Sequence, residues 1–271
     1  MLMTNFMKGR KSVREFKNKK ASTDILDHVA EYIETLEEEE GTGNIRFRVY
    51  ENGERIFNSF KGLGGYSGVM IESPHYVGLE LINNLEETMI FGAFYLERLI
   101  TRLNYLELDS CWISLDKVDE ETKKSVLGDS VGSINYLLAF GYGKQSNPFL
   151  NEPSSHRIGV EDLVFDRKLG SPIKMEELEN RGLGDIFYYV RFAPSSLNKQ
   201  PWRFILDGDK LFLLLKYEKD EKPSLVDAGI IMYYYVKLAE TIGLHSRWIL
   251  IPDKVEELGS ENYKYVAEIS L

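Results

Sequence analysis

Apolar residues recur along the chain at two different spacings, and these spacings distinguish helices from strands. Residues 23–36 predict a helix with one apolar face, behind Ser22 or Thr23 as its N-cap. That face carries Leu26, Val29, Ile33 and Leu36. The four glutamates at 37–40 fit a solvated helix end or a loop.

The next stretch predicts a hairpin, a strand and a second helix. IRFRVYENGERIF (45–57) alternates around Asn52-Gly53, a dipeptide typical of tight hairpin turns. SPHYVGLEL (73–81) has the composition of a strand. Residues 86–106 are apolar nearly all round, which predicts a buried helix.

The second half of the chain repeats this order of elements. Residues 176–192 predict a helix, WRFILDGDKLFLLL (202–215) a hairpin around Asp207-Gly208, and residues 227–242 a buried helix. Local identities accompany the repeat: Arg46-Phe47 with Arg203-Phe204, and Leu108, Ser110, Trp112 and Ile113 with Leu244, Ser246, Trp248 and Ile249. We interpret the chain as a duplicated α+β unit, with chance similarity as the alternative. The junction is expected near 150–165, within the Pro/Ser/Asn-rich SNPFLNEPSSH.

Composition limits the kind of protein. The 271 residues carry a net charge of -10, which argues against a general nucleic-acid binder. One cysteine, Cys111, excludes an internal disulfide, and the four histidines lack metal-ligand spacing, so no metal site is expected. The N-terminal residues do not form a signal peptide, and no apolar run reaches the length of a membrane span. We expect a cytoplasmic protein that binds no membrane.

A basic cluster, GRKSVREF (9–16), stands out in this acidic chain. Its cations and hydroxyl are Arg10, Lys11, Ser12 and Arg14. Arginine forks match phosphate oxygens, and serine adds a donor. The alternative is an ordinary charged turn near the N-terminus.

A second cluster, FAPSSLNKQPWRF (192–204), combines hydrogen-bonding side chains with two prolines that restrict the backbone. Its polar side chains are those of Ser195, Ser196, Asn198 and Gln200. The segment predicts a donor-rich loop for a polar ring edge or a ribityl-type chain. The alternative is a helix C-cap followed by a turn.

Together these segments resemble the FMN-dependent nitroreductase family over nearly the whole chain. GRKSVREF resembles its R-[RK]-S-x-R-x-F motif, and APSSLNKQPWRF resembles its A-P-S-x-x-N-x-Q-P-W-x-F segment. LELDSCWIS (106–114) is similar to the family's turn after the central helix. FGYGKQSNPFLNEPSSHRIGVEDLVF (140–165) resembles its closing strand and basic tail.

The resemblance is to a tandem branch. Family members carry both motifs near the N-terminus and dimerise to form flavin sites at the interface. Here RKSVR heads the first half and PSSLN the second, while EEGTGNIRF (39–47) and FDRKLGSP (165–172) are degenerate counterparts. The resemblance therefore implies an α+β fold of two nitroreductase-like halves, 1–160 and 161–271, each a mostly antiparallel sheet flanked by helices. Because both halves are fused in one chain as a pseudo-dimer, the protein would be a monomer.

Site residues follow from the resemblance position by position. Arg10, Lys11, Ser12 and Arg14 would hold the FMN phosphate and ribityl chain. Ser195, Ser196 and Asn198 would contact the flavin, with Pro194 shaping the loop. Arg157 would return to the phosphate, with Lys144 as a weaker choice, and Ser114 would lie near the flavin edge.

The implied activity is an oxidoreductase in which FMN takes hydride from NAD(P)H and passes electrons to a nitro compound, quinone or similar small acceptor. The alternative is a non-catalytic or cofactor-free relative acting as a binding or structural module, since half of each motif pair has decayed. No Ser/His/Asp or Cys/His arrangement competes with these two interpretations. The glycine-rich KGLGGYSG (61–68) is either a loop over the substrate face or a surface loop.

Overall fold

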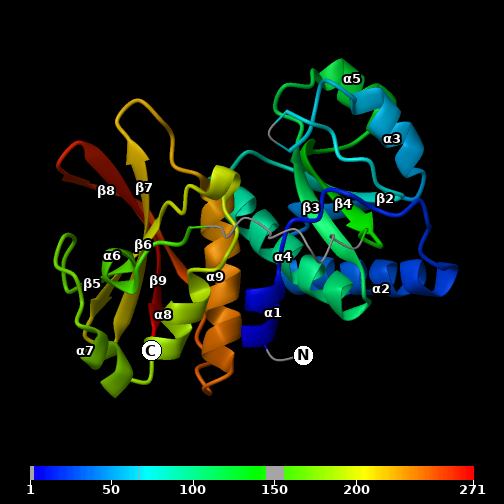
Figure 1. Cartoon of the computed structure of the whole chain (residues 1–271). Helices are drawn as coiled ribbons and strands as arrows, with labels where there is room; N and C mark the ends of the chain where they lie inside the picture. The colour runs from blue at the N-terminus through cyan, green and yellow to red at the C-terminus, as the bar shows by residue number, and fades with distance from the viewer. Residues whose placement is uncertain (1–2, 67, 145–155) are drawn as a thin grey trace. The chain divides into compact units, whose positions relative to one another are not determined.

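The computed structural model describes residues 3–66, 68–144 and 156–271. Its chain divides into two compact units, Lys11–Glu152 and a second that joins Met1–Arg10 to Pro153–Leu271 (Figure 1). Each unit combines helices with its own, mostly antiparallel sheet, so the predicted α+β class is confirmed. The junction was expected near 150–165; residues 145–155, which include most of SNPFLNEPSSH, lie outside the described residues.

The unit Lys11–Glu152 is built on a sheet in the order β1-β2-β4-β3, antiparallel at every pairing. Its strands are β1 (Ile45–Tyr50), β2 (His75–Leu81), β3 (Asp109–Ser114) and β4 (Ser133–Gly141). Its helices are α2 (Thr23–Glu40), α3 (Gly53–Phe60), α4 (Glu86–Tyr105) and α5 (Glu120–Leu127).

Alternation along β3 shows how the helices cover this sheet. Cys111 and Ile113 join a buried cluster with Phe60 of α3 and Leu127 of α5. Trp112, between them, points to the other face and donates its Nε1–H to Glu97 of α4 over 2.8 Å. Helices α3 and α5 therefore cover one face and α4 the other, as Figure 1 shows.

The second unit has a sheet in the order β5-β6-β7-β9-β8, parallel between β5 and β6 and antiparallel elsewhere. Its strands are β5 (Val164–Asp166), β6 (Trp202–Asp207), β7 (Lys210–Glu218), β8 (Ile249–Leu258) and β9 (Glu261–Ser270). Its helices are α1 (Met3–Gly9), α6 (Val160–Leu163), α7 (Met175–Asn180), α8 (Gly184–Val190), the 3-10 turn η1 (Ser196–Asn198) and α9 (Leu225–Glu240).

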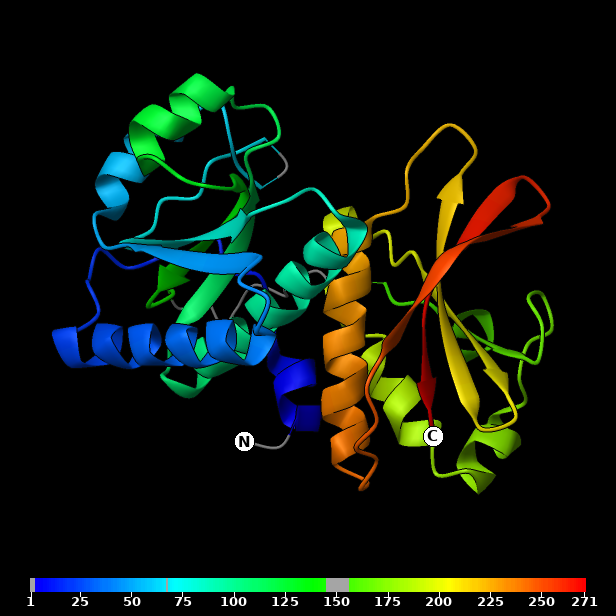
Figure 2. The ribbon, with the colours of Figure 1, turned by 180° about the vertical axis from the view of Figure 1, so that it is seen from behind.

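Helix α9 is the buried centre of this second unit. The rings of Phe187 on α8, Phe204 on β6 and Tyr235 on α9 pack with centroids 5.4 to 6.0 Å apart. The N-terminal helix α1 lies beside α9 in both views of the ribbon (Figures 1 and 2), and Phe6 stacks on Tyr234 at 6.2 Å. Helix α1 therefore packs against α9.

The two sheets share one connectivity. The order β1-β2-β4-β3 in one unit matches β6-β7-β9-β8 in the other, with antiparallel pairing throughout. In each unit a long buried helix follows the second strand of this order: α4 leads from β2 to β3, and α9 leads from β7 to β8. The repeat predicted from the order of elements thus has a counterpart in strand topology.

The predicted hairpin at Asn52-Gly53 is wrong. Asn52 caps helix α3 instead, and its Oδ1 accepts the Arg55 N–H over 3.3 Å. Ile56 and Phe60, four residues apart, bury one face of α3, a helical spacing that outweighs the turn signal. An added Cβ on Gly53 would lie 2.0 Å from the carbonyl oxygen of Ser73. The glycine is therefore needed because two backbone segments approach closely, and not because the chain makes a hairpin turn.

Other expected elements are present with changed limits. Helix α2 continues through the glutamate run to Glu40, and the helix expected at 176–192 is broken into α7 and α8. Gly182 between them has a φ of 69°, which ends the first helix. The Asp207-Gly208 hairpin, the strand 73–81 and the buried helices are confirmed. Among the described residues, no helix is both long enough and apolar enough for a membrane span.

Candidate functional site

The loop before β6 is held in an unusual backbone conformation. Leu197, Asn198 and Gln200 have φ values of 51°, 57° and 48°, in the left-handed region that residues other than glycine rarely adopt. Each such residue costs about 1 to 3 kcal/mol, so the surroundings must hold the loop in place. Such strain is common at ligand-binding sites.

Hydrogen bonds from both sides hold this loop. Ser195 Oγ accepts the Gln200 N–H over 2.9 Å and closes the loop on itself. The buried Gln200 side chain accepts the Ile158 N–H over 3.1 Å and donates to the His156 carbonyl over 3.0 Å. The loop is therefore fixed to the segment that follows residue 155.

Asn198 connects the loop to Arg157. Its Oδ1 accepts from Arg157 over 3.0 Å, and its Nδ2 donates to the His156 carbonyl over 3.0 Å. Arg157 also donates to the Ala193 carbonyl over 2.8 Å. The Asn198 side chain thus positions the guanidinium of Arg157. This role differs from the direct contact with the flavin that the motif resemblance implied.

Two positive charges act on one another here, that of Arg157, which is bonded to the loop, and that of Arg10. Burial lowers the pKa of Arg157, and the like charge of Arg10 lowers it further. Arg10 follows helix α1, whose last turn it closes with an N–H bond to the Phe6 carbonyl over 2.7 Å. An anion placed near both guanidinium groups would offset their repulsion.

A buried acid, Asp227, lies against the same loop and was missed by sequence reasoning. The residue is 1% exposed, and its Oδ1 accepts the Ser196 N–H over 3.0 Å. Burial raises the pKa of Asp227 to about 6. The available signal was the spacing of Ser224 and Asp227, an S-x-x-D pattern at a helix start, and Ser224 does cap α9.

Other predicted residues belong to the unit Lys11–Glu152. The Arg14 guanidinium lies 4.4 Å from the centre of the Tyr66 ring. Gly65 exchanges backbone hydrogen bonds of 3.0 and 3.2 Å with Ser114. Here an added Cβ on Gly65 would lie 2.2 Å from the Val69 carbonyl carbon. Arg14 and Ser114 thus contact neighbouring residues of the glycine-rich loop, Tyr66 and Gly65.

The predicted residues therefore fall into two groups, one in each unit. Arg10, Arg157, Pro194, Ser195, Ser196 and Asn198 are in the unit of α9. Lys11, Ser12, Arg14, Ser114 and Lys144 are in the other. Lys11 is exposed, Ser12 is half-buried, and Lys144 is exposed beside Glu15, to whose carbonyl its N–H donates over 2.9 Å.

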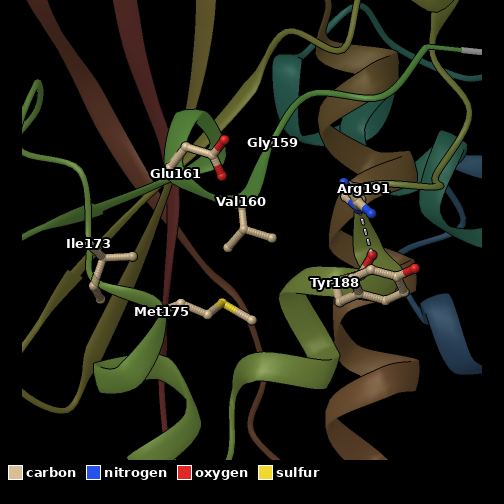
Figure 3. A pocket seen from close by; sticks show the side chains of 7 residues that line it. All are labelled: Gly159, Val160, Glu161, Ile173, Met175, Tyr188 and Arg191. Atoms are coloured by element: carbon tan, nitrogen blue, oxygen red, sulfur yellow. Dashed lines mark hydrogen bonds between the residues drawn. The ribbon is translucent and has the colours of Figure 1, made fainter.

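A pocket of about 320 Å³ opens beside the segment that carries Arg157 (Figure 3). Its lining combines apolar surface from Val160, Ile173, Met175 and Tyr188 with charge from Glu161 and Arg191. The Arg191 guanidinium lies 4.5 Å from the centre of the Tyr188 ring and donates to the Tyr188 carbonyl over 3.0 Å. It also donates to the Ile158 carbonyl over 3.5 Å. The Arg191 side chain is thus already hydrogen-bonded to two backbone carbonyls of its own unit.

Comparison with protein families connects this geometry to known proteins. A family model described as "Putative TM nitroreductase" matches residues 3–239. The chain belongs to this nitroreductase family. The match spans both units, including the basic cluster and the loop before β6. A search of the curated proteins finds no match.

The solved structures that match this chain include proteins described as nitroreductases. A crystal structure from Thermotoga maritima, described as a "putative nitroreductase", is 18% identical, with a TM-score of 0.58 over 98% of this chain and 94% of that one. Nitroreductase A from Vibrio parahaemolyticus is 12% identical, with a TM-score of 0.49 over 69% and 86%. A nitroreductase with bound FMN from Bacteroides fragilis is 17% identical, with a TM-score of 0.44 over 58% and 98%. At these identities the first likeness establishes the fold alone.

Proposed function

We propose that this nitroreductase-family protein binds FMN and acts as an NAD(P)H-dependent oxidoreductase on a small acceptor such as a nitro compound or a quinone. The family match and the two sequence motifs support the cofactor. Bound FMN would supply the redox chemistry by accepting and passing on a hydride or electrons. The protein would bind, orient and shield that cofactor.

The observation that carries this proposal is Arg157, which is bonded to the strained loop and on which the charge of Arg10 acts. Arg157 bonds to a carbonyl and an amide oxygen, and the like charge of Arg10 acts on it. A phosphate monoester presents the charge and acceptor oxygens that such a pair recognises. We assign the FMN phosphate to Arg10 and Arg157, with Asn198 holding Arg157 in place.

The loop fits the remainder of the cofactor. Ser195 uses its oxygen to accept from Gln200, which leaves its hydroxyl hydrogen to donate to a ligand, and Ser196 is exposed. Pro194 fixes the backbone before them. We propose that these residues meet the ribityl chain or the flavin edge.

Four further residues come to the proposal from the family resemblance. Lys11, Ser12 and Arg14 directly follow Arg10 in the chain and are proposed to serve the phosphate and the ribityl chain. Ser114, beside the glycine-rich loop, is proposed to lie near the flavin edge. The contact between Arg14 and Tyr66 supports a fixed orientation for that guanidinium.

We also propose that the chain is an internal duplication of halves 1–160 and 161–271. The shared strand order and the paired long helices support this origin. Because each motif is intact once, we expect one FMN per chain. We also expect a monomer, since a fused pair already contains both halves of the family's dimer.

The test is direct. The purified protein, incubated with FMN and freed of excess, should retain a flavin absorbance that NADH or NADPH bleaches without oxygen. Released flavin should equal the protein on a molar basis, and light scattering should give the mass of one chain. A ratio near two would overturn the single-site reading. Absence of flavin binding would favour the alternative, a cofactor-free relative.

A further inference from the structure

We propose that Asp227 is a positioning residue for the cofactor loop: its carboxylate holds the Ser196 backbone, and with it the ligand-binding shape of residues 195–198. The inference deepens the proposed function and rests on FMN binding there. Neither motif of the family resemblance includes this residue.

The geometry gives Asp227 a rigid base and a specific target. It lies in the first turn of α9, where Ser224 Oγ accepts its N–H over 3.4 Å. From there its Oδ1 accepts the Ser196 N–H over 3.0 Å. The next two residues, Leu197 and Asn198, are the first of the three strained ones. An acceptor fixed on a buried helix offsets that strain at the point where it begins.

A carboxylate is a costly way to make this contact, which indicates that its charge has a use. A neutral amide could accept the same N–H, whereas burying an ionised acid is unfavourable. An ionised carboxylate forms a shorter, stronger bond to an N–H. Asp227 therefore holds the loop more firmly when ionised.

The charged groups around Asp227 allow it to titrate near neutral pH. Lys199, in the loop itself, attracts the ionised form, and Glu221 before α9 pairs with Lys199 over 3.2 Å. Ser196 N–H and the Ser224 hydroxyl also favour the ionised form, while burial opposes it more strongly. Loop anchoring should accordingly strengthen as the pH rises through about 6.

The experiment compares Asp227→Asn with the wild type by FMN titration between about pH 5 and pH 8. Phosphate monoesters themselves titrate near pH 6, so the informative quantity is the ratio of the two Kd values at each pH. We expect the variant to bind about fivefold more weakly at the upper pH, and equally at the lower, because only the charged contribution is lost. Asp185 is an exposed acid on α8, outside the loop. Asp185→Asn removes the same charge and should give a Kd ratio of one at every pH.

A second measurement needs no cofactor. In the FMN-free wild type, the Ser196 amide resonance should titrate with Asp227, and this titration should vanish in Asp227→Asn. A Ser196 amide that does not titrate, or a Kd ratio independent of pH, overturns the positioning role. Loss of FMN binding in every form, with the amide titration intact, would refute the proposed cofactor and leave the role of Asp227 in the loop standing.

Discussion

Replacing Arg157 by glutamine should separate the proposed phosphate site from an ordinary structural arginine. The wild-type guanidinium donates to the Ala193 carbonyl over 2.8 Å and to Asn198 Oδ1 over 3.0 Å. Glutamine can keep one hydrogen bond but carries no charge. Arg157→Lys keeps the charge but loses the planar fork.

The size of the effect follows from the bond that would be lost. A charge-assisted hydrogen bond to phosphate contributes roughly 1.5 to 3 kcal/mol, and about 1.4 kcal/mol corresponds to a factor of ten in Kd. Arg157→Gln should therefore weaken FMN binding by about one to two orders of magnitude, and Arg157→Lys by less. Without FMN, stability should change little, because the lost hydrogen bonds are offset by relief of burial and of the repulsion from Arg10.

The assay is quenching of FMN fluorescence by added protein, at low and at high salt. High salt should weaken FMN binding by the wild type more than by Arg157→Gln, because the variant has already lost the charge that salt would screen. Arg181→Gln is the matched control, because Arg181 also donates to a backbone carbonyl, that of Gly208, over 2.6 Å. Equal Kd values for wild type and Arg157→Gln would refute the phosphate assignment.

Three further predictions concern stability, measured by urea or thermal unfolding. Burial raises the pKa of Asp227 to about 6, so stability falls as pH rises through that value; Asp227→Asn should add up to about 3 kcal/mol at pH 8 and nothing at about pH 4. Tyr235→Phe should stabilise by about 1 kcal/mol, because the buried hydroxyl has no hydrogen-bond partner among the described residues. Gly53→Ala should destabilise by about 1 to 3 kcal/mol, since its Cβ would lie 2.0 Å from the Ser73 carbonyl oxygen; a neutral result would contradict the account of helix α3.

Local patterns predicted elements wherever one signal acted alone. The strand-like composition of 73–81 and the apolar run in 86–106 became β2 and α4. Asn52-Gly53 and Asp207-Gly208 are similar turn dipeptides, yet only the second makes a hairpin. After Asn52 the buried positions follow helical spacing, whereas after Gly208 they begin with Leu211 and Leu213, two residues apart, and continue through Leu214 and Leu215. The hydrophobic period, and not the dipeptide, decided between helix and hairpin.

The candidate site was predictable as a set of residues but not as a set of contacts. Arg157 and Asn198 both came from motif resemblance, and the hydrogen bond between them spans 41 positions in sequence. Asn198 makes that bond from a left-handed backbone conformation, which no apolar pattern encodes. Asp227 resembles an ordinary helix cap in sequence, and only the fold brings it to the Ser196 amide.

The packing of α1 against α9 has a consequence for the order of events during synthesis. Phe6 leaves the ribosome long before Tyr234, the ring on which it stacks. At about 5 to 20 residues per second, the interval is on the order of 10 to 45 s. All of Lys11–Glu152 leaves the ribosome within that time, before Tyr234 has been made. Phe6 therefore lacks the ring on which it stacks until the last long helix is made.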